Sequence, residues 1–458
     1  MVATCRNFYV ATLVHSIASQ PTFYNRIAPP FSLVHDDLLG RMIGVLHNGN
    51  LPSIREELWA YFYILPKLHK TPTTWRPIVA AHNCSTTTAN RVLSAALRLV
   101  LSTLQRKYAA EFQATGLRKL WLIENSLEFV LTRPEHIRHI FSSDINSMYT
   151  NLDQTFVINA VSLEILNAAN HVSTTYVKVR LHTTKYGNQV DSAVWSNSRA
   201  QLRLGEGLYS LHQLNRLLDF VVKHVFFKVG NALFRQTQGI PMGGNSSPFL
   251  ANLALLHLER TFVEKYPNTT LQHSIFRYLD DFAVVNHPEF AQISVYKLVY
   301  PDSTGIQLIS NTPKHPRPNT LTETQFLDLD IWVTLATNRM PSCTFISLFD
   351  KRLAFGFHVI KFPNTYSNTY TPQAQTTFYT EIVRLYRINT HSHLFLQNAM
   401  ELATFCILHN GFDPLNLFVQ FVKFVHQIRH HNHLLPASVL VTSLIPQMLT
   451  FLLQHVPQ

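Results

Sequence analysis

FRYLDDFAVV, residues 276–285, is the stretch that decides the fold of this 458-residue chain. It reads as apolar residues, a turn and apolar residues again, which predicts a β-hairpin with Leu279, Asp280 and Asp281 at its bend. An Asp-Asp pair more often lies in a solvated turn. The apolar flanks here favour a turn held in a buried sheet, where carboxylates with a perturbed environment are candidates for a functional role.

Asp144 offers a third carboxylate, at the end of a strand expected over 137–145. Magnesium prefers oxygen ligands and keeps several waters, so two or three aspartates at strand ends are an adequate protein contribution. Nucleotidyl transfer uses two such ions about 3.5–4 Å apart, one for the attacking hydroxyl and one for the triphosphate and leaving group. The pattern therefore predicts Asp144, Asp280 and Asp281 as ligands of two Mg²⁺ ions, with Mn²⁺ as the alternative metal.

A basic turn lies upstream, within LPKLHKTPTTWRPIV at 65–79. Lys67 and Lys70 can act as point charges on phosphate, and the guanidinium of Arg76 can bind phosphate with two hydrogen bonds. Taken alone, the segment more often indicates an ordinary basic hairpin.

A glycine-rich loop begins at Gln238, in QGIPMGG at 238–244. It combines a side-chain amide with glycines that let the backbone approach a ligand closely. The alternative is a plain turn before the helix expected over 247–258.

Four segments in order resemble reverse transcriptases. They are LPKLHKTPTTWRPIV at 65–79, FSSDINSMYTNL at 141–152, QTQGIPMGGNSSPFLANLALLHLE at 236–259, and FRYLDDFAVV, which carries the Tyr-x-Asp-Asp signature. The resemblance implies an α+β right-hand polymerase fold, with fingers, a palm built on an antiparallel sheet and a helical thumb. It also implies an RNA-directed DNA polymerase that extends a primer 3′-hydroxyl with deoxynucleoside triphosphates. Its partners would be an RNA template, a DNA primer and the RNA/DNA duplex.

The same resemblance assigns individual roles. Tyr149 would form an aromatic wall against the sugar 2′ position, which indicates deoxynucleotide use, although a tyrosine there can also be simple core. Nucleotide contacts are implied at Lys67, Lys70, Arg76, Tyr149, Gln238 and Gly239, and primer or template contacts at Tyr278, Pro241, Met242, Gly243, Phe326 and Leu327. Lys314 would be the catalytic acid that protonates pyrophosphate, with Lys297 as the alternative in that interval. Asp328 and Asp330, in FLDLDIWV at 326–333, are not expected to bind metal.

Further details resemble the Penelope-like branch of reverse transcriptases. They are PKLHK at 66–70, MYTNL at 148–152, FLDLDI at 326–331, Lys351-Arg352, and a thumb pattern of Glu381, Arg384, Arg387, Phe395 and Gly411-Phe412. Members of this branch often carry a Gly-Ile-Tyr/Tyr-Ile-Gly endonuclease. That pair is absent here, and no carboxylate set after the thumb suggests ribonuclease H, so we expect an enzyme that extends an end made elsewhere.

The chain organisation expected from these patterns has three parts. They are an N-terminal extension at 1–45, fingers and palm at 46–340 with an insertion near 171–206, and a helical thumb with a tail at 341–458. Hydrophobic periodicity predicts strands at 58–65, 78–79, 137–145 and 324–333, and helices at 90–104, 211–227 and 247–258.

The composition agrees with a polyanionic partner, because the net charge is +11 and the sequence pI is about 9.5. Four scattered cysteines signal neither a disulfide framework nor a zinc site. We expect an intracellular protein, in the nucleus, with the mitochondrion as the alternative. The uncharged run 434–453 is interrupted by prolines and polar residues, which favours a buried terminal helix pair over a membrane span. His426, His430, His431 and His433 are expected on a basic thumb face rather than around a metal.

Two other functions remain open from the sequence. A viral RNA-dependent RNA polymerase usually has glycine where Leu279 stands and lacks an aromatic sugar wall. An inactive, nucleic-acid-binding relic of a mobile element would be expected to have a damaged metal site, whereas the three aspartates here are intact.

Overall fold

The structure is a computed structural model. It describes residues 6–46, 58–67, 74–81, 84–184, 189–198, 200–310, 317, 319–336, 342–349, 371–428 and 443–455. Lys70, Lys314, Lys351, Arg352, His430, His431 and His433 lie outside the described residues, so their expected roles stay predictions.

The chain forms two compact units that alternate along the sequence. Unit 1 comprises Met1–Leu122, Asp144–His273 and Glu289–Ile309, and unit 2 comprises Ile123–Ser143, Ser274–Pro288 and Ser310–Gln458.

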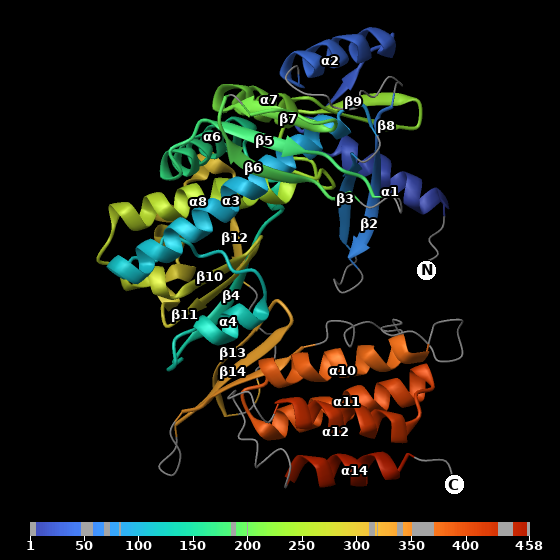
Figure 1. The fold of residues 1–458 in the computed structure, drawn as a ribbon, viewed down its shortest axis with the longest axis vertical. Helices are drawn as coiled ribbons and strands as arrows, with labels where there is room; N and C mark the ends of the chain where they lie inside the picture. Colours follow the sequence, from blue (N-terminus) through green and yellow to red (C-terminus); the bar gives the residue numbers. More distant parts are fainter. Residues whose placement is uncertain are drawn as a thin grey trace. The chain divides into compact units, whose positions relative to one another are not determined.

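Unit 1 contains a five-stranded sheet in the order β1-β9-β8-β2-β3 (Figure 1). Its strands are β1 (Tyr24–Ile27), β2 (Ala60–Lys67), β3 (Thr74–Ala80), β8 (Val225–Val229) and β9 (Ala232–Gln236). Because side chains alternate along a strand, Phe62 and Ile64 of β2 are buried whereas Tyr61 and Leu65 are exposed. The 1–45 segment, expected as an extension, therefore contributes the edge strand β1 to this sheet, beside β9.

The helices of unit 1 are α1 (Arg6–Ala18), α2 (Phe31–Leu46), α3 (Thr87–Thr115), α5 (Met148–Asn151), α6 (Gln154–His171), α7 (Leu211–Lys223), α8 (Ser247–Lys265) and α9 (Ile293–Val299). Short 3₁₀ turns cover η1 (Thr270–His273) and η3 (Asp302–Thr304). Apolar residues at helical spacing make α3 the long central helix, with Val92, Leu97 and Val100 fully buried.

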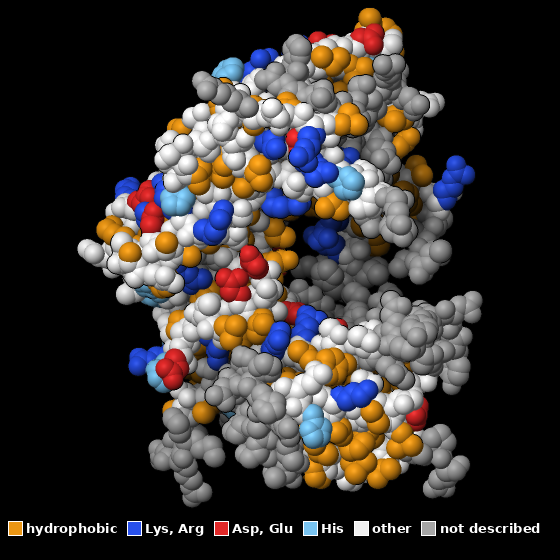
Figure 2. All heavy atoms as spheres, in the orientation of Figure 1, with side chains coloured by type: hydrophobic (Ala, Val, Ile, Leu, Met, Phe, Trp, Pro, Cys, Tyr) orange, Lys and Arg blue, Asp and Glu red, His pale blue; other side chains and the backbone are white. Residues whose placement is uncertain are grey.

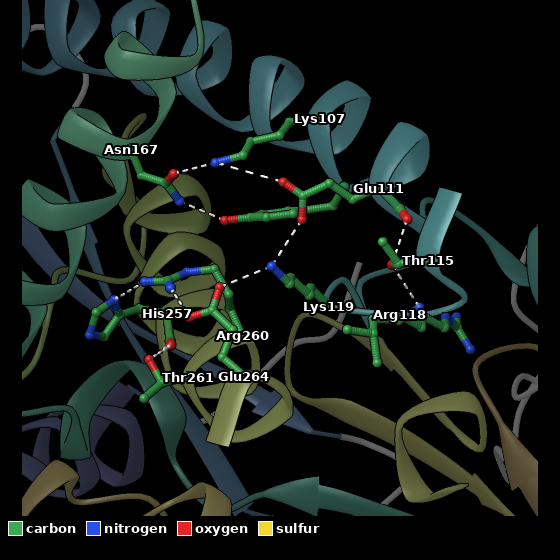
Figure 3. A network of polar contacts seen from close by, with 12 residues as sticks. Lys107, Glu111, Thr115, Arg118, Lys119, Asn167, His257, Arg260, Thr261 and Glu264 are labelled. Atoms are coloured by element: carbon green, nitrogen blue, oxygen red, sulfur yellow. Dashed lines mark hydrogen bonds and ion pairs between the residues drawn. The ribbon is translucent and has the colours of Figure 1, made fainter. Parts of the chain in front are cut away.

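A polar network joins α3, α6 and α8 (Figure 3). Lys119 bridges Glu111 of α3 (2.9 Å) and Glu264 of α8 (3.1 Å). Deeper in the unit, the fully buried carboxylate of Glu164 on α6 accepts hydrogen bonds from His257 Nδ1 (2.9 Å) and Arg260 Nη2 (2.8 Å) on α8. Burial alone raises the pKa of Glu164, but the hydrogen bonds from His257, Asn167 and Arg260 and the positive charge of Arg260 outweigh burial and lower that pKa. The buried charge is thus compensated, as a buried ion pair must be.

The polar stretch 171–206, expected to hold an insertion, contributes to a three-stranded antiparallel sheet in the order β6-β5-β7. Its strands are β5 (Tyr176–Arg180), β6 (Ser192–Ser196) and β7 (Glu206–Ser210). We call it the inserted sheet. One face packs on α3, where Trp195 Nε1 donates to Thr103 Oγ1 (2.9 Å).

Unit 2 contains the hairpin of β10 (Ile275–Tyr278) and β11 (Asp281–Val285), and the sheet β13 (Thr320–Phe326), β14 (Leu329–Thr334) and β15 (Thr344–Leu348). Helix α4 (Ser126–Thr132) also belongs to unit 2. The 3₁₀ turn η2 (Pro288–Ala291) begins with the last residue of one segment of unit 2 and continues with the first residues of the last segment of unit 1. One apolar cluster includes Phe129, Phe276, Phe326 and Ile331. Strand order β10-β11-β4-β12 places β4 (Ile140–Ile145) beside β11 and beside β12 (Leu308–Ser310).

The predicted helical C-terminal region is present in unit 2. Its helices are α10 (Thr371–Ile388), α11 (Ser392–Asn410), α12 (Pro414–Ile428) and α14 (Ile445–Leu453), which form a stack (Figure 1). Met448 and Leu452, from the uncharged run, are buried against the other helices. None of the described helices combines the length and apolar character needed to cross a membrane.

Two predicted elements were wrong. The helix expected over 211–227 ends at Lys223, because Val225-Phe226-Phe227 pairs as strand β8 with β9. The single strand expected over 324–333 is a hairpin that turns at Leu327-Asp328. The buried residues change from even positions, Thr324 and Phe326, to odd positions, Leu329 and Ile331. This shift of the period-two pattern was a detectable sign of the turn.

Candidate active site

The Asp-Asp pair lies where β10 turns into β11. Tyr278 and Asp281 are cross-strand partners, so only Leu279 and Asp280 form the bend between β10 and β11. Leu279 has a φ of +54°, a left-handed conformation that costs a non-glycine residue about 1–2 kcal/mol. Such strain persists only where the surroundings determine the backbone, and it concentrates at functional sites.

The strands on both sides of this turn are buried. Phe276, Phe282 and Ala283 are completely buried, whereas Asp280 and Asp281 are half-buried and reach solvent. Two adjacent carboxylates are therefore held at the end of an apolar hairpin, as the sequence predicted. Their oxygens are the ligand type that Mg²⁺ prefers.

Arg277 is a residue that the sequence analysis missed. Its side chain is fully buried, and Nη1 donates to the carbonyl oxygen of Leu279 at 3.2 Å. Its own carbonyl accepts from the amide of Ile123 (2.8 Å). The guanidinium therefore stabilises the strained turn from within the protein. The signal available in the sequence was an arginine at an inward position of an apolar strand.

Asp144 lies near the end of β4, between the buried Ser143 and Ile145, and is itself half-buried. It belongs to unit 1, whereas Asp280 and Asp281 belong to unit 2. Within the described residues, no three His, Cys, Asp or Glu side chains gather as a metal-binding group. It thus stays a prediction that the three aspartates bind the same metal ions. The observation that fits a metal site is the pair of half-buried carboxylates at Asp280 and Asp281.

Tyr149 follows Asp144 by five residues and lies in the short helix α5, not on a strand. The chain enters this helix through Ser147, whose φ is +48°. The carbonyl oxygen of Tyr149 accepts a hydrogen bond from the amide of Ile240 at 2.7 Å. The structure therefore brings the backbone at Tyr149 against the predicted glycine-rich loop.

The loop at 238–244 needs its glycines. Gly239 has a φ of +72°, and a Cβ there would lie 2.4 Å from the carbonyl oxygen of Tyr149. Gly243 has a φ of +118°, and its Cβ would lie 2.5 Å from the carbonyl oxygen of Val79 on β3. The amide of Val79 also donates to Met242 O (2.8 Å). The loop is thus fastened to α5 on one side and to β3 on the other.

The same strand β3 carries Arg76, which is exposed and pairs across the hairpin with Leu65. Lys67 is paired with Thr74 at the described end of that hairpin. Unit 1 therefore holds the predicted nucleotide contacts Lys67, Arg76, Tyr149, Gln238 and Gly239, linked through the loop and β3. Gln238 is half-buried, and its carbonyl accepts from Gln236 Nε2 (2.9 Å).

A second Leu-Asp turn occupies the predicted primer-contact region. Leu327 has a φ of +57°, and Phe326 beside it is buried in the apolar cluster of unit 2. Asp328 forms an ion pair with Arg384 of α10, and Asp330 one with Arg317. Burial raises the pKa of Asp330 despite the Arg317 charge. Both carboxylates therefore have an arginine partner.

On the predicted thumb, Lys423 and His426 lie beside Phe418, Val419 and Val422 around an open groove of about 450 Å³ on α12. The lining of this groove is mostly apolar.

No protein-family model matches the chain, and no curated protein matches it by sequence. Among solved structures, it is similar to telomerase from Candida albicans in complex with the TWJ fragment of telomeric RNA. That match has a TM-score of 0.58 and 12% identity, and covers 98% of this chain and 66% of that chain. Apo telomerase from Candida tropicalis matches with a TM-score of 0.45 and 11% identity, covering 99% and 71%. An insertion loop deletion mutant of the RNA-dependent RNA polymerase of a human picobirnavirus matches with a TM-score of 0.41 and 13% identity, covering 86% and 64%.

The chain spans 66% of the length of the Candida albicans telomerase chain that it matches. At 12% identity this likeness concerns the fold alone. It extends over nearly all of this chain, through both the mixed strand-and-helix part and the helical C-terminal part. The prediction of an α+β right-hand polymerase fold is thereby confirmed.

Proposed function

We propose that this protein is an RNA-directed DNA polymerase, which adds deoxynucleotides to a primer 3′-hydroxyl on an RNA template. The observation that carries the proposal is the half-buried pair Asp280 and Asp281 on a strained two-residue turn of a buried hairpin. Its setting in a polymerase fold, with the sequence blocks in family order, supports the same reading.

Asp144, Asp280 and Asp281 would hold two divalent ions, which when bound stabilise the charge that develops on the attacking and leaving oxygens. The protein groups have other tasks. Arg76 and Lys67 would bind the triphosphate, and Gln238 and Gly239 would position the nucleotide against the loop. The primer 3′-hydroxyl would release its proton to solvent as its oxygen forms a bond to the α-phosphorus, while the bond from that phosphorus to pyrophosphate breaks. Lys314 would supply the proton to that leaving group.

Tyr149 would restrict the sugar. In this proposal its ring stands where a ribose 2′-hydroxyl would otherwise fit, so deoxynucleotides are preferred. The fixed backbone of Tyr149, bonded to the amide of Ile240, supports a rigid wall.

We also propose membership in the Penelope-like branch, without the associated endonuclease. This rests on the sequence details at 66–70, 148–152 and 326–331 and on the Arg384 and Phe412 region. Such an enzyme would need a 3′ end supplied by a nick, a chromosome end or an added primer.

The test is primer extension on an RNA template, with deoxy- or ribonucleotides and Mg²⁺ or Mn²⁺. Asp280→Asn removes one negative charge at the turn and should lower the rate at least about 100-fold. Asp37→Asn is the matched control, because Asp37 lies exposed on α2 in an ion pair with Arg41, and it should retain the full rate.

Each alternative has its own outcome. Incorporation of ribonucleotides alone would assign an RNA polymerase. A folded protein that binds template but incorporates nothing would be a relic. If the Asp280→Asn variant were as active as Asp37→Asn, the proposed metal site would be wrong.

A further inference from the structure

The inserted sheet has one covered face and one open face. Val177, Val179 and Tyr209 are completely buried on the side that packs on α3. Because cross-strand partners share a face, the register assigns Lys178, Val194 and Leu208 to the opposite side. Val194 is 51% exposed there. The outer face is thus accessible to a ligand.

The open face combines cations with an aromatic ring. Tyr176, Lys178 and Arg180 follow one another along the outer side of the central strand β5, and Arg180 is exposed. Ser192 and Ser196 on β6 are the cross-strand partners of Arg180 and Tyr176. The face therefore offers a ring for stacking, two cations for phosphates and two hydroxyl groups.

Positive charge is concentrated in this segment. Residues 172–210 contain five Lys and Arg against two Asp and Glu, a net +3, while the other 419 residues together carry +8. Glu206 on β7 is the cross-strand partner of Arg180 and contacts Lys178 at 3.6 Å, so it offsets one positive charge on this face, while Arg180 and Arg203 are exposed. Figure 2 shows basic side chains gathered over the region where Figure 1 places β5, β6 and β7. A polyanion is thus the complementary partner.

The inserted sheet is connected to the glycine-rich loop. Gln189, in the connection between β5 and β6, accepts a hydrogen bond from Asn245 Nδ2 (3.5 Å), one residue after Gly244. The carbonyl of Asn245 accepts from Ser94 of α3 (3.0 Å). Arg91 of α3 binds Asp191, at the start of β6, with two hydrogen bonds of 2.8 Å and 2.6 Å. These bonds therefore link the β5–β6 connection to α3 and to the residue that follows the loop.

We propose that the outer face of the inserted sheet binds single-stranded RNA of the template next to the glycine-rich loop. Bases stack on aromatic rings, phosphates pair with cations, and serine hydroxyls can bond to the ribose 2′-hydroxyl. An acidic protein surface would meet the cations but make no use of the ring of Tyr176. The choice of template RNA rests on the proposed polymerase function, whereas the surface itself does not.

The test measures RNA binding on an Asp280→Asn background without nucleotides, so that polymerisation plays no part. The probe is an unstructured RNA of about 16 nucleotides, matched to a single-strand site. Replacing Lys178 and Arg180 together by Gln should reduce the slope of log affinity against log salt by about 1.4, which is about 0.7 for each phosphate that is no longer neutralised. Tyr176→Ala should weaken binding roughly 5- to 150-fold without changing that slope.

The matched control is Arg41→Gln with Lys223→Gln, which lowers the net charge equally in two exposed ion pairs outside the inserted sheet. If this control changed affinity and slope as much as the β5 variants, the surface would have no specific role. Equal affinity for DNA of the same sequence would overturn the choice of RNA as the ligand. If polyglutamate competed as effectively as unlabelled RNA, the face would instead be assigned to an acidic protein. Thermal melting confirms folding of each variant. If the β5 variants bind RNA more weakly but the native protein never extends a primer, the proposed RNA-binding surface stands and the proposed polymerase function is wrong.

Discussion

The amide of Ile240 donates to the carbonyl oxygen of Tyr149 at 2.7 Å, which fixes the glycine-rich loop to the turn that follows Asp144. This bond involves only backbone atoms, so the side chain of Tyr149 can be changed without breaking it. Tyr149→Ala should increase the use of ribonucleotides relative to deoxynucleotides, because it removes the proposed sugar wall. We expect a change of roughly 10- to 200-fold in that ratio. Single-nucleotide extension kinetics measure it, and an unchanged ratio would mean that Tyr149 does not select the sugar.

Alanine substitutions at Gly239 and Gly230 distinguish the cost of a steric clash from the cost of a left-handed backbone. Both have positive φ, +72° and +57°, but a Cβ at Gly230 meets nothing within 4 Å. Gly230→Ala should cost only the left-handed penalty, about 1–2 kcal/mol. Gly239→Ala should cost more, since its Cβ would collide with the backbone of Tyr149 and Thr150. Thermal unfolding measures the difference, and equal destabilisation would show that the loop can move away from α5.

The two Leu-Asp turns should respond differently to asparagine, which tolerates positive φ better than leucine. Leu279→Asn should raise the free energy of unfolding by about 0.5–1 kcal/mol by relieving strain. Leu327→Asn should lower it, because Leu327 packs against the apolar cluster of unit 2. Urea unfolding of both variants checks this contrast. Stabilisation by both, or by neither, would show that packing does not distinguish the turns.

Glu164→Gln should destabilise the protein by about 3 kcal/mol, since it removes the buried carboxylate that Arg260 and His257 bond to and leaves Arg260 paired only with the partly exposed Glu264. Glu111→Gln is the control: Glu111 is partly exposed beside Lys119, and its replacement should cost at most about 1 kcal/mol.

The Glu164 contribution should also depend on pH. Its pKa is lowered in the folded state, so the stabilisation is complete above its ordinary value of about 4.5 and is lost as pH falls through the lower folded value. The stability difference between the native protein and Glu164→Gln should therefore shrink below pH 4.5. A difference that stays constant in acid would indicate that Glu164 is not charged in the folded protein.

The sequence was sufficient for much of the site. Apolar flanks correctly located Asp280 at the bend of a buried hairpin, although Asp281, also expected in the bend, is the first residue of β11. The Gly-Pro pattern correctly located a loop of close backbone approach. Both signals are local, because they depend on residues adjacent in the chain. The four resembling blocks also led to the polymerase fold.

Other features depended on distant partners. Nothing beside Arg277 in the sequence shows that its guanidinium bonds to the Leu279 carbonyl. Tyr24–Ile27 is an edge strand only because β9, some 200 residues later, pairs with it. The sequence predicted an insertion near 171–206 but not its strands, because these strands have short apolar runs that become buried only against α3. Non-local pairing of this kind leaves little pattern in the sequence.

The alternation of the two units along the chain has a consequence for biosynthesis. Unit 1 gains its last segment, Glu289–Ile309, only after the β10–β11 hairpin of unit 2 has been made. During translation the ribosome therefore releases the Asp280–Asp281 turn before either unit has all of its residues. No single cut of the gene yields one complete unit, so fragments for expression must be designed as joined discontinuous segments or as the whole chain.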